Sequence, residues 1–195
     1  LSTIGLDYTY DDLTINLNFD KSFAANEECV IRVDYRIQDP ISGLQFSAPD
    51  EKRPDFPYYA ITDNETERAR YWFPCVDFPT VRSKMDYHLT ADEKLTILAN
   101  GALVSEETKD GMKTSHWKLD YPCASYLACF AIGEFSVYQD KPLRDMPIAY
   151  FADKSYTPEQ LQRTFEPTRK MLIWMEKKLD MAFTYPKYFQ IAGRA

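Results

Sequence analysis

The stretch 85–119, MDYHLTADEKLTILANGALVSEETKDGMKTSHWKL, decides the fold class of this chain. In residues 85–90 apolar and polar side chains alternate, and this period of two predicts a half-buried strand with His88 on its polar face. Asn100-Gly101 and Asp110-Gly111 are strong turn signals that divide the remainder of the stretch. The stretch therefore predicts an antiparallel meander, with further strand segments over 95–99, 102–104 and 114–119.

The flanking sequence continues this β pattern. Residues 13–20 and 29–38 both alternate, and the connection 23–27 between them predicts a pair of half-buried antiparallel strands. Residues 126–132 are apolar on both faces, which predicts a fully buried strand. The chain is thus expected to be mainly β from residue 1 to about residue 145.

A helical segment is predicted after this β region. Thr157, Pro158 and Gln160 form a capping-box start with proline at the first helical position. Pro167 should kink or split the helix, and residues 184–191 can form a strand after it. Apolar or small side chains recur at helical spacing at Leu161, Phe165, Thr168, Leu172, Met175 and Leu179.

Charged and proline residues interrupt the apolar runs between Asp140 and Met146. This break divides the chain into a β-domain over residues 1–145 and the opening of an α-containing domain over residues 146–195.

Composition excludes several classes of protein. The 195 residues are 45% hydrophobic and 27% charged, which is ordinary for a globular protein. A net charge of -7 disfavours a nucleic acid partner. The longest nearly apolar run is far too short to span a bilayer, and the first residues lack a signal core, so no membrane association is expected. The location is left open, with the cytoplasm favoured.

The cysteines and histidines show no metal-binding pattern. Four cysteines contain no C-x-x-C pair, and His88 and His116 share no close spacing with them or with each other. No metal site is therefore expected in this chain. Reduced, mostly buried thiols are favoured over a disulfide or metal role for Cys29, Cys75, Cys123 and Cys129.

No catalytic motif is present, but the neighbourhood of residues 63–79 is unusual. Asp63, Glu65 and Glu67 alternate, so on a strand they would share one face, either as a solvated acidic edge or as a pocket for a cation. The aromatic run 71–73 is expected to be core, with flanking prolines shaping a turn. Asn64-Glu65-Thr66 is also a glycosylation sequon.

Several ordered motifs together resemble the zinc aminopeptidases related to aminopeptidase N and leukotriene hydrolase. Residues 69–79, ARYWFPCVDFP, resemble the family's A-R-x-x-F-P-C-x-D-x-P signature, and 98–101, LANG, resemble its S-N-G turn. Residues 125–135 resemble the strand that closes the family's amino-terminal domain, and 185–188, YPKY, the segment before its G-x-M-E-N motif. The resemblance covers nearly the whole chain.

The resemblance implies a saddle-like antiparallel β-sheet or sandwich domain, without its first strands, over residues 1–145. Residues 146–195 would be the opening helix and strand of a thermolysin-like α/β catalytic domain, ending before G-x-M-E-N and the H-E-x-x-H zinc helix. The intact protein would then be a zinc-dependent aminopeptidase. This chain would hold no zinc and be inactive alone, and the missing catalytic domain would be its partner.

The resemblance also carries one site across. Its members place a T-Q-x-E or T-Q-x-Q segment in the active-site cleft, where the acid binds the free α-amine of the peptide substrate. The corresponding residues here are 62–65, so Glu65 takes the acidic position and Asp63 replaces the usual glutamine. A fixed carboxylate that pairs with an ammonium sets the register an exopeptidase needs. A glycan on Asn64 would obstruct that cleft.

Two functions of different classes remain open. One is the peptidase, for which the fragment shapes the cleft and anchors the substrate amino terminus. The other is a non-catalytic protein-binding module, as in transcription-factor relatives of the family. Glu65 favours the enzyme because a scaffold needs no amine anchor, whereas Asp63 weakens it.

Overall fold

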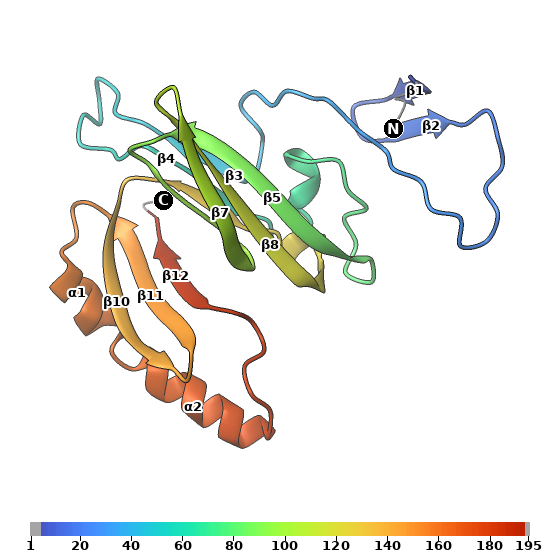
Figure 1. Cartoon of the computed structure of the whole chain (residues 1–195). Helices are drawn as coiled ribbons and strands as arrows, with labels where there is room; N and C mark the ends of the chain where they lie inside the picture. The colour runs from blue at the N-terminus through green and yellow to red at the C-terminus, as the bar shows by residue number, and fades with distance from the viewer. Residues whose placement is uncertain (1–4, 194–195) are drawn as a thin grey trace. The chain divides into compact units, whose positions relative to one another are not determined.

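The computed structural model describes residues 5–193, which form two compact units that meet between Tyr35 and Arg36 in the sequence. In the first unit β1 (Asp7–Tyr10) pairs antiparallel with β2 (Ile15–Asn18) (Figure 1). The carboxylate of Asp11 accepts hydrogen bonds from the backbone N–H groups of Leu13 and Thr14, at 3.0 and 2.6 Å, and so closes the turn. The strand predicted over 13–20 is confirmed in its central part.

The second predicted strand of this region is wrong. Residues 29–38, all of which the structure describes, form no strand, and Ile31 and Val33 are 45% and 38% exposed. Alternation defines two faces of an extended segment, but a strand forms only where a neighbouring strand accepts and donates its backbone hydrogen bonds. No described residue supplies that neighbour here.

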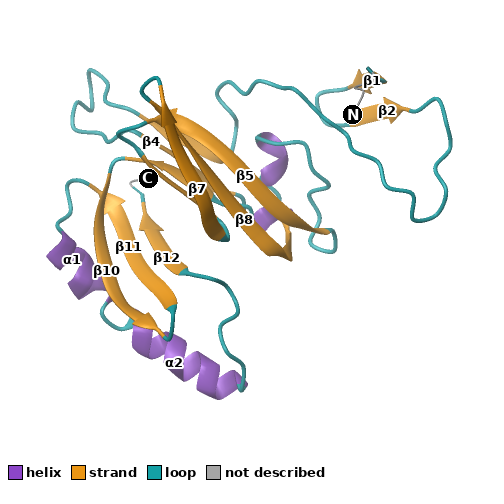
Figure 2. Ribbon diagram, viewed as in Figure 1, coloured by secondary structure: helices purple, strands orange, loops and turns teal. Residues whose placement is uncertain are grey.

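The second unit contains three sheets (Figure 2). A four-stranded sheet has the order β3 (Gly43–Ser47), β4 (Tyr59–Asp63), β9 (Phe130–Gly133), β6 (Thr96–Ala99). A three-stranded sheet has the order β5 (Arg82–Asp92), β8 (Met112–Ala124), β7 (Ala102–Lys109). The third has the order β10 (Phe135–Leu143), β11 (Met146–Asp153), β12 (Tyr188–Ala192), with β12 parallel to β11.

Both predicted turns are present and do different things. Asp110 and Gly111 have φ angles of 52° and 78°, as the two-residue β7–β8 hairpin requires. Asn100 and Gly101 instead carry the chain from β6 in one sheet to β7 in another. Gly101 has φ +82°, and a Cβ there would lie 1.9 Å from the carbonyl oxygen of Lys118. Only glycine fits this crossing.

The predicted strand 126–132 is only half correct. Its first residues belong to a 3₁₀ helix, Ser125–Leu127, in which Leu127 is 45% exposed, and strand β9 begins at Phe130. The continuous apolar run gives no signal for this break, because tertiary hydrogen bonds to Ser125 and its neighbours produce it.

The helical predictions are confirmed. In α1 (Pro158–Phe165) the hydroxyl of Thr157 accepts from the backbone N–H of Gln160, whose side chain accepts from the backbone N–H of Thr157. Pro167 separates α1 from α2 (Thr168–Leu179). The apolar stripe is buried only where the helices lie against β10 and β11, so Leu161 and Leu172 are buried while Leu179 is 58% exposed.

Two apolar clusters hold this unit together. One packs residues of all three sheets, including Leu98, Trp117, Phe130 and Phe151. The other packs the third sheet against the helices, through Ile148, Tyr150, Leu161 and Leu172. The predicted boundary at residues 145/146 lies in the turn between β10 and β11, which pair along most of their length. The division into 1–145 and 146–195 stays a prediction.

A buried carboxylate fixes the loop between β4 and β5. The side chain of Asp77 is 3% exposed, and its Oδ2 accepts from the backbone N–H and from Nε of Arg70, both at 3.2 Å. Its other oxygen accepts from the hydroxyl of Ser125. One charged group thus joins the 3₁₀ helix Ala69–Tyr71 to the one before β9.

Replacing Gly101 by alanine should lower the free energy of unfolding by about 3 kcal/mol or more, because the added Cβ meets backbone that has no room to move. Gly111→Ala is the matched control, since it has φ +78° but open space around the added atom. That variant should lower the free energy of unfolding by only about 1–2 kcal/mol, which is the cost of the left-handed backbone conformation for alanine. Urea unfolding of the purified chain measures both, and equal losses would contradict the steric argument.

Asp77→Ala should cost about 2–4 kcal/mol of unfolding free energy, because Ser125 and the Arg70 backbone lose their acceptor inside the protein. Asp63→Ala removes an equally charged residue whose ion pair is exposed, and should cost no more than about 1 kcal/mol. The same unfolding measurement separates them. A small effect of Asp77→Ala would show that the loop is held by its apolar contacts.

Candidate functional site

The two predicted site residues flank a buried asparagine at the end of β4. Asn64 is only 3% exposed; its amide nitrogen donates to the carbonyl of Ala128, and its Oδ1 accepts from Nε1 of Trp72 at 2.7 Å. Thr62 is also buried and exchanges hydrogen bonds with the backbone of Phe130. Residues 62–64 are therefore hydrogen-bonded to the protein interior through Thr62 and Asn64. Asp63, between them, and Glu65, after them, are exposed.

The three alternating acids do not share one strand face, so that prediction is wrong. β4 ends at Asp63, and the chain turns so that the backbone N–H of Arg68 donates to the carbonyl of Asn64 at 3.0 Å. This turn separates Glu67 from the strand, where it forms an ion pair with Arg70 at 3.4 Å. Side chains alternate between two faces only within a strand, and β4 ends at the first of the three acids.

The acids also differ in their partners. Asp63 forms an ion pair with Arg68 at 3.1 Å. Among residues 5–193, the carboxylate of Glu65 has neither a hydrogen-bond nor an ion-pair partner. Glu65 is therefore the carboxylate of this turn that is available to an external cation.

The burial of Asn64 decides the question of the sequon. Both ends of its amide are engaged inside the protein, so the side chain is not accessible to a glycosylating enzyme in the folded chain. The aromatic run next to it was predicted to be core, and this is correct only in part. The half-buried ring of Trp72 packs against Phe130 with centroids 5.2 Å apart, whereas Tyr71 is 43% exposed.

A second polar cluster lies beside a cavity of about 300 Å³ lined by residues of β6, β12 and the segment before β12. The ammonium of Lys187 donates to the carbonyls of Ala99, at 2.7 Å, and Gly101, and lies 4.4 Å from the ring centre of Trp117. Burial lowers the pKa of Lys187 to about 8. The sequence marked this lysine only as part of a motif, and the structure gives it the role of joining β12 to the β6–β7 turn.

Neither this cavity nor a second one, lined by residues between Asp39 and Tyr59, is lined by Asp63 or Glu65. Asp63 and Glu65 themselves are exposed.

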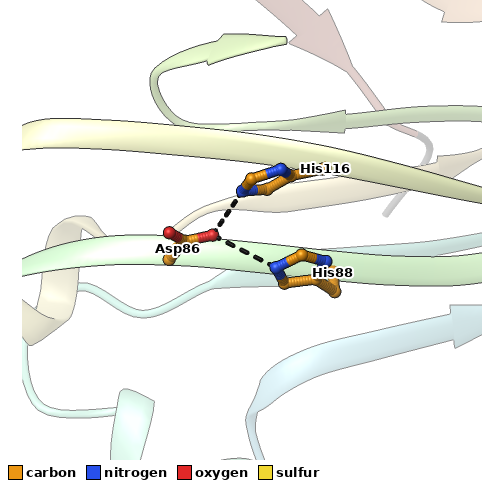
Figure 3. A group of neighbouring side chains, drawn as sticks. All are labelled: Asp86, His88 and His116. Atoms are coloured by element: carbon orange, nitrogen blue, oxygen red, sulfur yellow. Dashed lines mark hydrogen bonds and ion pairs between the residues drawn. The ribbon is translucent and has the colours of Figure 1, made fainter. Parts of the chain in front are cut away.

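The premise that the histidines lack partners is wrong. Figure 3 shows His88 of β5 and His116 of β8 side by side, with Asp86 next to them. The two histidines are direct cross-strand partners, and their rings stack with centroids 4.2 Å apart. Linear spacing gave no sign of this, because the two histidines are 28 positions apart and β6 and β7 lie between their strands in the chain. The predicted meander is wrong at this point, since it would separate strands 85–90 and 114–119; they pair because β6 belongs to another sheet.

The cysteines are all free, but they are less buried than expected. Cys123 is buried, Cys75 and Cys129 are half-buried, and Cys29 is exposed, which contradicts the prediction for that residue. Its strand 29–38 did not form, so no sheet covers it. Burial raises the pKa of the Cys75 thiol to about 11, which keeps it protonated and poorly reactive near neutral pH.

Comparison with known proteins gives a consistent result. Residues 3–127 match the model of the peptidase M1 N-terminal domain. The mitochondrial aminopeptidase 2 of Saccharomyces cerevisiae is 27% identical over 172 residues, covering 88% of this chain and 18% of that protein. The puromycin-sensitive aminopeptidase of Caenorhabditis elegans is 28% identical over 195 aligned residues, covering 96% of this chain and 20% of that protein.

One similar protein has a different name. Transcription initiation factor TFIID subunit 2 of Drosophila melanogaster is 23% identical over 167 residues, covering 83% of this chain and 13% of that protein. The chain spans at most about a fifth of the length of these relatives. Among the described residues, no helix is both long and apolar enough to cross a membrane.

The family model covers residues 3–127, which is well over half of the chain. The chain therefore belongs to the peptidase M1 family and contains its N-terminal domain.

Proposed function

We propose that this chain is the N-terminal part of a zinc-dependent aminopeptidase, in which it shapes the substrate cleft and anchors the free α-amine of a peptide through Glu65. The observation that carries the proposal is that the carboxylate of Glu65 is exposed and has no partner among residues 5–193, while the hydrogen bonds of the neighbouring Asn64 hold its backbone in place. A carboxylate fixed in this way can pair with an ammonium group without first breaking another ion pair.

Asp63 is assigned a lesser part in this proposal. Its carboxylate already pairs with Arg68, so a substrate amine would compete with that guanidinium. The second contact to the amine would therefore be weaker than the first.

The zinc ion of such an enzyme would polarise the scissile carbonyl and activate a water molecule. The 195 residues contain no H-E-x-x-H sequence, and their two histidines lie on a sheet surface of which Glu65 is no part, so they do not fit that catalytic role. The partner that supplies it is the catalytic domain of the intact protein, and this chain alone would be inactive.

A non-catalytic binding module is the second candidate, and the similarity to the TFIID subunit favours it. The two functions differ in what the intact protein does. Hydrolysis of aminoacyl substrates with one essential zinc ion supports the peptidase, whereas an intact protein without zinc or turnover supports the binding module.

In the intact protein, Glu65→Ala should lower kcat/KM for peptide substrates by about 30-fold to several thousand-fold. This range corresponds to the loss of about 2–5 kcal/mol when one partner of a desolvated charge pair is removed. Asp63→Ala should lower kcat/KM less, because its carboxylate is shared with Arg68. Steady-state kinetics with an unblocked dipeptide substrate measures both effects, with zinc content determined in parallel.

The matched control is Glu67→Ala, which removes an exposed acid two residues further along that pairs with Arg70. It should leave kcat/KM close to that of the unmodified protein. If Glu65→Ala retains full activity, or if all three variants lose activity alike, Glu65 is only solvated surface and the anchor is refuted.

A further inference from the structure

Three potential metal ligands meet on the outer face of the β5–β8–β7 sheet. Asp86 and His88 are two residues apart on β5, so they point to the same face, and His116 lies directly opposite His88 on β8. Nε2 of His116 and Nε2 of His88 lie 2.6 and 3.3 Å from the same Oδ1 of Asp86 (Figure 3). One potential ligand atom from each residue lies within 4.8 Å of the other two.

The two separations that involve Asp86 are close to those of an occupied metal site, and the third is no more than 4.8 Å. A tetrahedral zinc ion with bonds of about 2.1 Å holds its ligand atoms about 3.4 Å apart. The distance from His88 to Asp86 is already 3.3 Å, and that from His116 needs to open by less than about 1 Å. Because the two imidazoles are stacked, one ring must turn to direct its nitrogen lone pair at a shared ion. The side chains of Asp86 and His88 are 51% and 65% exposed, so no surrounding core obstructs that rotation.

The backbone beneath these side chains is fixed. β8 is the central strand of its sheet, so it is hydrogen-bonded to neighbours on both sides. The next rung on the same face, Thr90 and Thr114, is joined by a hydrogen bond of 2.8 Å between the hydroxyl groups. The Cβ positions of the three ligands are therefore set by the strand register before any ion binds.

The charges around the cluster also suit a cation. Lys118 lies across from Asp86, but its ammonium forms an ion pair with Asp120 at 3.2 Å. Asp86 is thus left to the two imidazoles, and the chain as a whole carries a net charge of -7. Two imidazole nitrogens and one carboxylate oxygen are ligands that favour zinc, copper or nickel ions over magnesium or calcium.

We propose that Asp86, His88 and His116 form a binding site for a divalent transition-metal ion, principally Zn²⁺. The three side chains supply three coordination positions, and the exposure of the site leaves a fourth for water. This replaces the expectation that the chain holds no metal, since that expectation assumed that the two histidines had no partner.

Titration of the 195-residue chain with Zn²⁺ by isothermal calorimetry tests the site. One ion should bind per chain. Among the side-chain ¹⁵N resonances, only those of the imidazoles of His88 and His116, the two histidines of the sequence, should shift. His88→Gln and His116→Gln should each weaken binding by at least about tenfold, as should Asp86→Asn, because each removes a ligand. An excess of Mg²⁺ should not displace the ion.

Glu93→Gln is the matched control, since it removes one acidic charge in the turn that follows β5 and leaves the three ligands intact. It should bind Zn²⁺ as the unmodified chain does. Far-UV circular dichroism checks that each variant is folded. If one of the three ligand variants misfolds, the zinc affinities of the other two still test the site. Absence of saturable binding, or equal weakening by Glu93→Gln, would overturn the proposal.

Discussion

The buried carboxylate of Asp77 is the interaction on which the arrangement of the second unit most depends. A charge removed from water is tolerated only when hydrogen bonds and an opposite charge replace its hydration. Asp77 obtains these from Arg70 and Ser125, which lie 55 residues apart in the sequence. Satisfying one carboxylate therefore brings the loop after β4 against the start of β9.

Other buried or half-buried polar side chains form hydrogen bonds with the backbone of β9 and of the segment just before it. Asn64 is bonded to the carbonyl of Ala128, Thr62 to the backbone of Phe130, and Asn100 to the backbone N–H of Cys129. Each satisfies backbone groups where regular pairing of β9 stops or changes partner. These side chains therefore fix the ends of β9 relative to β4 and β6.

The same contacts distinguish the acids of this region by their partners. Asp77 is hydrogen-bonded inside the protein and Asp63 is paired with Arg68, whereas Glu65 is exposed and has no partner among residues 5–193. In the proposed function Glu65 is therefore the carboxylate that would bind a substrate amine, because the position of the charge then defines the position of the bound terminus. On the β5–β8 sheet, strand register rather than a loop fixes the second group of polar side chains, and it is suited to an ion instead of a peptide.

The sequence by itself determined the features that depend on neighbours in the chain. Local backbone and side-chain preferences predict four features that the structure confirms: the Thr157 capping box, the break at Pro167, the Asp110-Gly111 hairpin and the alternation of β5. The ordered motifs also identified the family and drew attention to Glu65 and Asp63.

Only the tertiary structure decided which extended segments became strands and which polar residues met. Residues 29–38 alternate as well as residues 85–90, yet only the latter found partner strands to satisfy their backbone groups. Likewise, Asp86, His88 and His116 came together through the register of β5 and β8, which the pairing of whole strands sets. Contacts across a sheet depend on which strands pair and in what register, and local preferences along one segment do not encode that choice.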